Sequence, residues 1–120
     1  IHCTYDPETK GGNAPDGRKV KGTIHWVNAE DCIEAEVRLY DRLFTVEQPG
    51  ADGVDFLTQL NPDSIKSVNA VMEKSLDALK VGEVVQFERV GYFACDQDST
   101  AERKVFNRTV TLKDSWAKKK

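Results

Sequence analysis

Residues 84–112 contain two runs in which apolar and polar side chains alternate with a period of two, joined by a polar connection. Alternation of this kind is typical of strands that are buried on one face only. Gly91 interrupts the pattern, as a bulge or a sharp bend would, and the chain returns over 105–112. The predicted faces of the first run are Val85, Phe87 and Arg89 on one side and Val84, Gln86 and Glu88 on the other. We therefore expect a sheet with polar groups on its open face.

Other segments also predict strands. Residues 20–27 and 33–40 alternate clearly, and 1–5 and 65–72 are strand-like. Turn-forming residues fill 6–17. Short helices are expected at 54–60 and 75–79, and no long amphipathic helix is evident. For 33–40 the predicted inward residues are Ile33, Ala35, Val37 and Leu39. Six or so short strands predict an all-β fold, a closed or nearly closed antiparallel barrel.

A chain of 120 residues with 39% apolar residues fits one compact domain. We expect this domain to cover 1–116 and a basic tail to cover 117–120. No stretch is apolar enough for a membrane helix and no signal-peptide pattern opens the chain, so we expect no membrane association. The chain opens on Ile1 without a preceding Met, and we interpret it as a fragment of a longer protein.

The cysteines and histidines do not form a recognisable metal-binding or catalytic pattern. The three cysteines, Cys3, Cys32 and Cys95, are widely spaced, and only two histidines are present. This argues against a zinc site. Unpaired thiols suit a reducing cytosol and so a cytoplasmic protein, and burial as small apolar residues is expected for all three. No catalytic set and no phosphate loop is recognisable, so we expect this segment to be non-catalytic and without a cofactor.

The charges are unevenly distributed. The net charge of −3 argues against a general polyanion binder. Nine acidic residues against two arginines fall within 30–63, whereas seven basic residues against one acid fall within 103–120. A local basic face on an acidic protein is therefore compatible with the sequence.

Binding fits the polar side chains of 84–112 better than catalysis does. Small barrels bind nucleic acid with aromatic, amide and guanidinium groups on an open sheet face. The amide of Gln86 can both donate to and accept from a base edge, and Arg89 can contact a phosphate or stack on an unpaired base. The alternative is a solvated strand face with a Glu88–Arg89 or cross-strand ion pair of little energetic value.

Four blocks together resemble the C-terminal anticodon-binding region of bacterial glutaminyl-tRNA synthetase, a class I aminoacyl-tRNA synthetase. They occur in that family's order, and the resemblance extends from the opening IHCTYD to Trp116. The blocks are KGTIHWV at 21–27, RLYDRLF at 38–44, QFER at 86–89 with GYF at 91–93, and VFNRTV at 105–110.

The resemblance implies a parent enzyme that joins glutamine to its tRNA with ATP, while this segment binds the anticodon loop. In that family the anticodon-binding region consists of two six-stranded barrels that resemble a ribosomal protein binding 5S RNA and that exchange N-terminal strands. The implied partners are the glutamine tRNA and the upstream catalytic domain and barrel strands of the same chain. The parent is expected to be a monomer.

The resemblance also implies roles for individual residues. Gln86 falls on the family glutamine that contacts the central uracil of the anticodon, and Arg89 matches an arginine on the tRNA-facing side. Lys113 stands where some relatives have arginine, and we expect Lys113 and Arg108 to contact the tRNA backbone. Arg38 is interpreted as a structural residue in ion pairs. Two alternatives stay open: a barrel that serves protein interaction or structure without RNA specificity, and the same region of a glutamyl-tRNA synthetase.

Overall fold

The computed structural model describes residues 2–9, 14–19, 22 and 24–112. The described residues form five strands and four short 3-10 helices, and no α-helix occurs among them. The strands are β1 (Cys32–Tyr40), β2 (Ile65–Glu73), β3 (Val84–Phe87), β4 (Gly91–Cys95) and β5 (Lys104–Thr111). The 3-10 helices are η1 (Pro7–Thr9), η2 (Ala51–Gly53), η3 (Phe56–Gln59) and η4 (Lys74–Ala78). The all-β prediction is therefore confirmed.

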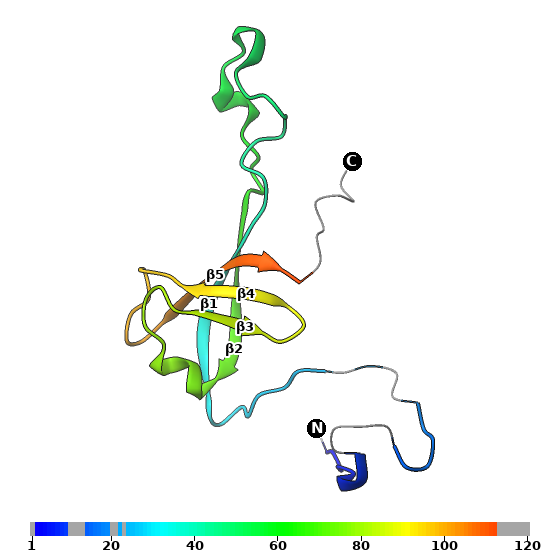
Figure 1. Cartoon of the computed structure of the whole chain (residues 1–120). Helices are drawn as coiled ribbons and strands as arrows, with labels where there is room; N and C mark the ends of the chain where they lie inside the picture. Colours follow the sequence, from blue (N-terminus) through cyan, green and yellow to red (C-terminus); the bar gives the residue numbers. More distant parts are fainter. Residues whose placement is uncertain (1, 10–13, 20–21, 23, 113–120) are drawn as a thin grey trace.

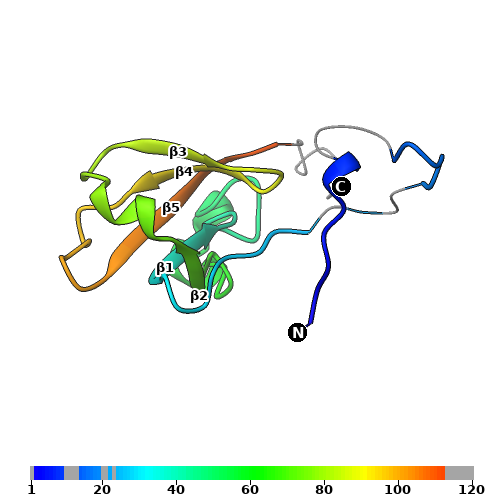
Figure 2. The same cartoon turned by 90° about the horizontal axis from the view of Figure 1, so that it is seen from below.

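One open sheet contains all five strands in the order β2-β1-β5-β4-β3 (Figures 1 and 2). The pairs β1–β2, β3–β4 and β4–β5 are antiparallel, whereas β1 and β5 are parallel. The sheet therefore differs from the predicted antiparallel, six-stranded closed barrel. Alternation along a strand indicates which face is buried, but it does not indicate the direction of a neighbour that lies about 70 residues away in the chain.

The predicted strands at 1–5 and 20–27 are not formed by the residues described there. The described parts of both segments have no strand assignment, and residues 24–28 run away from the sheet as extended chain (Figure 1). Ile24 and Trp26, the apolar residues of this alternation, are 83% and 82% exposed. A strand requires a neighbouring edge for its backbone hydrogen bonds, so a correct alternation alone does not produce one.

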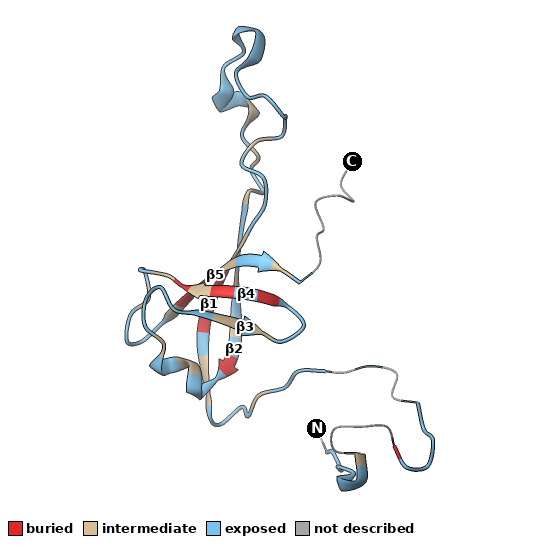
Figure 3. Cartoon of the chain, in the orientation of Figure 1, coloured by how far each residue is buried: buried red, intermediate tan, exposed pale blue. Residues whose placement is uncertain are grey.

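Most of the buried residues lie within the strands of the sheet (Figure 3). Ala35 and Val37 are buried on β1 and Ile33 and Leu39 pack against the same cluster, which confirms the predicted inward face. An aromatic group fixes the other side of the core. The Phe87 ring stacks on Phe93 with centroids 4.4 Å apart and meets Phe106 edge-on at 5.5 Å. Phe93 and Phe106 are fully buried.

The three cysteines have three different environments. Cys95 is buried in the core, Cys32 is half-buried with its Sγ 3.5 Å from the carbonyl oxygen of Ala29, and Cys3 is exposed. Burial was therefore correctly predicted for Cys95 and was wrong for Cys3, which lies in a segment that has no contact with the sheet to bury it (Figure 1).

The two predicted short helices are 3-10 turns. Asp55 caps η3 by accepting from the Leu57 N–H, and extended residues flank both η3 and η4. So few residues cannot offset the cost of nucleating an α-helix. Leu76 and Leu79, in and just after η4, pack against the core, and the Lys104 ammonium donates to the Leu79 carbonyl at 3.1 Å. η4 therefore covers one end of the sheet.

Residues 41–64 form a long arm between β1 and β2 that projects away from the sheet (Figure 1). Its two sides are joined by a bridge between Phe44 and Leu60 and by a hydrogen bond from Asn61 N to the Leu43 carbonyl at 2.8 Å. The Phe44 and Phe56 rings meet edge-on at 6.5 Å. The arm nevertheless leaves several apolar side chains exposed: Leu43, Val46, Val54, Phe56, Leu57 and Leu60.

Candidate nucleic-acid interface

The predicted recognition pair, Gln86 and Arg89, lies on the hairpin formed by β3 and β4. The turn is closed by a hydrogen bond from Val90 N to the Phe87 carbonyl at 2.9 Å. β3 ends at Phe87, so Arg89 occupies the turn and not the strand face with Val85 that was predicted for it. Arg89 has a φ of 63°, a left-handed conformation that is uncommon for a bulky residue. The hairpin therefore presents Gln86 from a strand and Arg89 from its tip.

The two faces of β3 were otherwise correctly predicted. Val85 and Phe87 are half-buried toward the core, whereas Val84 and Gln86 are exposed on the open face. Gln86 lies directly opposite Tyr92 on β4. No hydrogen bond from another described residue engages the Gln86 amide, so its donor and its acceptor are both available to a ligand.

Arg89 forms an ion pair with its neighbour Glu88, with 3.1 Å between Nη1 and Oε1. Both side chains are more than half exposed. Exposed pairs of this kind contribute roughly 0–1 kcal/mol. The ion pair is the one expected under the alternative of a solvated face, yet it is too weak to prevent Arg89 from exchanging Glu88 for a phosphate.

Gly91 follows the turn and permits an unusually close approach between β4 and β5. A Cβ at this position would lie 2.6 Å from the Val110 carbonyl oxygen. The register shifts between Tyr92 and Phe93, so that Tyr92 pairs with Val110 while Phe93 pairs with Arg108. The predicted bulge is therefore present one residue beyond Gly91.

The two candidate backbone-contact residues are separated from Gln86. Arg108 is half-buried on β5 and is paired with Phe93. Because directly opposed residues share a face, this register puts Arg108 on the face of Phe93 and Gln86 on the other. Lys113 and the tail 117–120 lie outside the described residues. The structure thus brings Gln86 and Arg89 onto one hairpin, but it does not bring Arg108 onto the face of Gln86.

An ion-pair network centred on Arg38 lies on the open face of β1. Arg38 donates from Nε to Glu36 Oε1 at 2.8 Å and from Nη1 to Asp98 Oδ2 at 2.7 Å, and Asp96 Oδ1 lies 3.6 Å away. Arg103 approaches the second oxygen of Glu36 at 2.8 Å. Arg38 is therefore structural, as predicted. Its partners Asp96 and Asp98 were not predicted, because nothing local connects β1 with the β4–β5 connection.

The network shifts the protonation equilibria of its members. The hydrogen bond from Arg38 lowers the pKa of Glu36, and the same pairing raises the pKa of Arg38. The Asp98 backbone N–H, followed by the Asn107 amide, lowers the pKa of Asp96. Asn107 also accepts from the Tyr40 hydroxyl at 3.0 Å. These groups satisfy one another, which disfavours them as ligand-binding residues.

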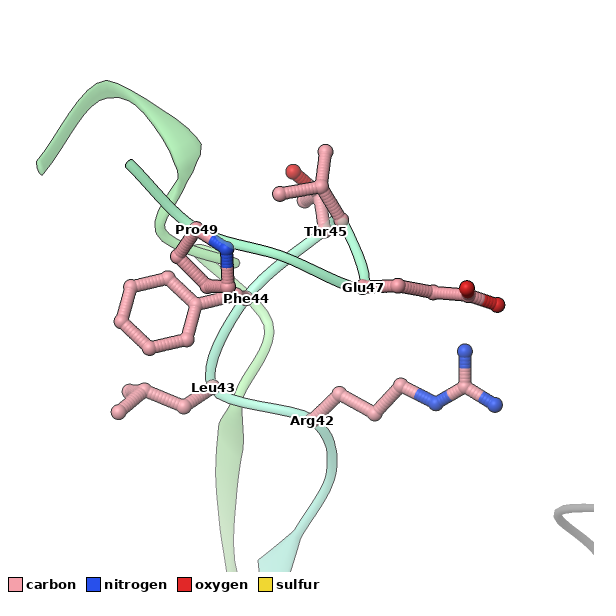
Figure 4. A pocket seen from close by; sticks show the side chains of 7 residues that line it. Arg42, Leu43, Phe44, Thr45, Glu47 and Pro49 are labelled. Atoms are coloured by element: carbon pink, nitrogen blue, oxygen red, sulfur yellow. The ribbon is translucent and has the colours of Figure 1, made fainter. Parts of the chain in front are cut away.

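Two hollows lie elsewhere on the described surface. One lies on the arm and is lined by 42–47 and Pro49, with Leu43 and Phe44 on one side and Arg42 and Glu47 extending to the other (Figure 4). The second is lined by 26–28, Asp31 and 73–75. Neither includes a residue of the β3–β4 hairpin. Within the described residues, no three metal-ligating side chains come together and no helix could cross a bilayer.

Comparison with known proteins identifies the class to which this fold and hairpin belong. Residues 23–96 match the family described as "tRNA synthetases class I (E and Q), anti-codon binding domain". This match covers more than half of the chain, and the chain belongs to that family.

Its similarity to individual relatives is more specific. The chain is 56% identical over 119 residues to the glutamine–tRNA ligase of Vibrio parahaemolyticus and to that of Nitrobacter winogradskyi, covering 98% of this chain and 21% of each relative. It is 54% identical over 120 residues to the glutamine–tRNA ligase of Rhodopirellula baltica, covering 98% of this chain and 20% of the relative. The chain therefore spans about a fifth of the length of these relatives.

Proposed function

We propose that this chain is the anticodon-recognition part of a glutamine–tRNA ligase, an enzyme that joins glutamine to its tRNA with ATP. The observation that carries the proposal is the exposed Gln86 amide on the β3–β4 hairpin of a chain that belongs to an anticodon-binding family. ATP binding and catalysis would reside in the upstream catalytic domain of the enzyme, and this segment would hold no cofactor of its own.

In this proposal, Gln86 hydrogen-bonds the edge of the central anticodon base, and Arg89 binds the neighbouring backbone from the tip of the hairpin. Unstacked loop bases expose the edges that such an amide recognises, whereas phosphate contacts position the loop without reading it. Lys113, which follows β5 in the chain, would add a backbone contact, and Arg108 would contact the backbone from the face of Phe93, away from the base that Gln86 contacts. Both lie in the basic part of the chain, 103–120.

The open sheet supports a further structural proposal. The outer edges of β2 and β3 have no neighbouring strand among the described residues, and Ile24 and Trp26 are 83% and 82% exposed. Upstream strands of the parent would complete six-stranded barrels through strand exchange. We propose a monomeric, cytoplasmic parent in which tRNA binding here favours the catalytically competent arrangement of the distant active site.

A second candidate is a module that binds protein or supports the structure without RNA specificity. The six exposed apolar side chains of the arm favour it, because apolar side chains that gather on a surface are typical of an interaction site. The two functions are compatible if the arm packs against another part of the same enzyme. A glutamyl-tRNA synthetase is less well supported, since the family covers both specificities but the relatives described above are glutamine–tRNA ligases.

The decisive experiment measures charging by the full-length enzyme with tRNAs altered at the central anticodon base. Gln86→Ala should reduce discrimination at that base by roughly 1–3 kcal/mol and leave discrimination at the first base largely unchanged. Gln86→Glu keeps the size and an acceptor but loses the donor, which tests whether the amide N–H is used. Unchanged discrimination in Gln86→Ala would show that the role proposed for Gln86 is wrong.

A further inference from the structure

We propose that Tyr92 supplies the stacking surface for the unpaired base whose edge Gln86 contacts, so that one base is held by both its face and its edge. The inference rests on the proposed function. It identifies a second binding residue that no comparison assigns, and it follows from the pairing of β3 with β4.

Gln86 and Tyr92 are directly opposed across the antiparallel pair. Directly opposed residues point to the same face, and their Cβ atoms lie roughly 4.5–5.5 Å apart. This face is the one opposite to the stacked rings of Phe87 and Phe93. An amide and an aromatic ring are thus neighbours on the open face of the β3–β4 hairpin.

Tyr92 makes no evident contribution to the core. It is 41% exposed, whereas Phe93, the next residue, is 1% exposed. Its hydroxyl has no hydrogen-bond partner within the described part of the chain. Tyr40, the exposed tyrosine on β1, differs because its hydroxyl donates to Asn107 at 3.0 Å. The ring of Tyr92 is therefore available to a ligand.

The neighbours of Tyr92 suit an unpaired base. Val110, paired with Tyr92 on β5, is 58% exposed and extends the apolar surface. On β4, the backbone of Tyr92 is fixed by its carbonyl, which accepts from the Thr109 hydroxyl at 3.1 Å. Because the backbone of Tyr92 is already held in the sheet, only side-chain freedom is lost when a base stacks on the ring.

The two side chains offer complementary chemistry. Every base has an aromatic face, so stacking on tyrosine contributes affinity with little sequence preference. An amide beside the ring can then read the donor and acceptor pattern of the edge of the same base. Tyr92 would thus supply most of the affinity at this position, and Gln86 most of the selectivity. Tyr92 and Gln86 are coupled because both contact the same base.

The test uses the full-length enzyme and two forms of the cognate tRNA, one intact and one with an abasic nucleotide at the centre of the anticodon. Binding is measured for wild type, Tyr92→Phe and Tyr92→Leu. We expect Tyr92→Leu to weaken binding of the intact tRNA by roughly 5- to 100-fold. Tyr92→Phe, which keeps the ring, should remain within about 2-fold of wild type.

The abasic tRNA separates stacking from a structural role. Without a base to stack on Tyr92, wild type and Tyr92→Leu should bind it equally. A matched control is Val71→Ala, an exposed apolar residue on β2 at the other edge of the sheet, which should bind both tRNAs as wild type does. Circular dichroism of each variant would verify the fold.

Three results would overturn the inference: no loss in Tyr92→Leu, the same loss on intact and abasic tRNA, or an equal loss in Tyr92→Phe. The last would indicate a hydroxyl contact instead of stacking. Failure of the proposed function has a different signature. In that case wild type would not distinguish tRNAs altered at the central base, and Gln86→Ala would change nothing.

Discussion

Arg38 on β1 donates a hydrogen bond to Asp98 at 2.7 Å and so joins residues separated by 60 positions in the chain. Together with Glu36 and Asp96, it fastens the β4–β5 connection to the parallel pair of β1 and β5. That connection also contains the hydrogen bond from Asp96 N to the Val105 carbonyl at 2.8 Å. The network therefore stabilises the longest-range pairing of the sheet.

Replacement of Arg38 by Met should loosen this connection. The acidic side chains of Glu36 and Asp96 are only 15% and 16% exposed, so they would lose their counter-charge where water compensates poorly. We expect a lower unfolding midpoint and faster amide exchange at Asp96. Hydrogen–deuterium exchange of the full-length enzyme would measure the exchange rate at Asp96.

The matched control is Arg18→Met. Arg18 also pairs with two acids, Asp6 and Asp16, but these side chains are 39% and 55% exposed. Its loss should change stability much less than the loss of Arg38. Equal effects of the two substitutions would contradict a special contribution from the network on β1.

The same network predicts a pH dependence. Glu36 and Asp96 have lowered pKa values in the folded state, so their contribution is present above the unfolded pKa and is lost as the pH falls through the folded pKa. Stability should therefore fall on acidification below about pH 5. Glu36→Gln should be less stable than wild type at neutral pH, with the difference shrinking as the pH decreases. A constant difference from pH 7 to about 3 would show that the carboxylate of Glu36 does not contribute through its charge.

Replacement of Gly91 by alanine should destabilise the packing of β4 against β5. In Gly91→Ala the new Cβ would meet the Val110 carbonyl oxygen at 2.6 Å, and because that atom belongs to the backbone, β4 and β5 must separate. Overpacking of this kind costs roughly 1–3 kcal/mol. The denaturant midpoint of the full-length enzyme would measure this cost. Gly22→Ala is the control, since no atom lies within 4 Å of a Cβ there.

Local patterns predicted part of this molecule well. The alternation of Ile33, Ala35, Val37 and Leu39 identified the buried face of β1 because it depends only on neighbouring residues. The same reasoning correctly assigned Gln86 to an open face. It also predicted a strand at 20–27, where Ile24 and Trp26 alternate correctly but have no partner strand among the described residues.

Features that depend on distant contacts were not predictable. Nothing near Arg38 indicates Asp98, and nothing in β1 or β5 indicates that they run parallel. For the candidate site, the tight turn after Phe87 removed Arg89 from the strand face, and the register shift after Tyr92 separated Arg108 from Gln86. Turn geometry and bulges change which residues share a face, and alternation alone does not encode them.

Arg89 allows stability and RNA binding to be separated in a single residue. Its φ of 63° favours glycine, so Arg89→Gly should relieve backbone strain and raise the stability of the enzyme by about 0.5–1 kcal/mol. The lost ion pair with Glu88 offsets little of this gain, because both partners are exposed.

If Arg89 contacts a phosphate, Arg89→Gly should also bind tRNA more weakly and reduce the slope of log affinity against log salt by about 1. Arg89→Lys is the control, since it keeps both the charge and the strain and should preserve most of the salt dependence. Unchanged tRNA affinity in a stabilised Arg89→Gly enzyme would show that the strain at this turn does not serve RNA binding.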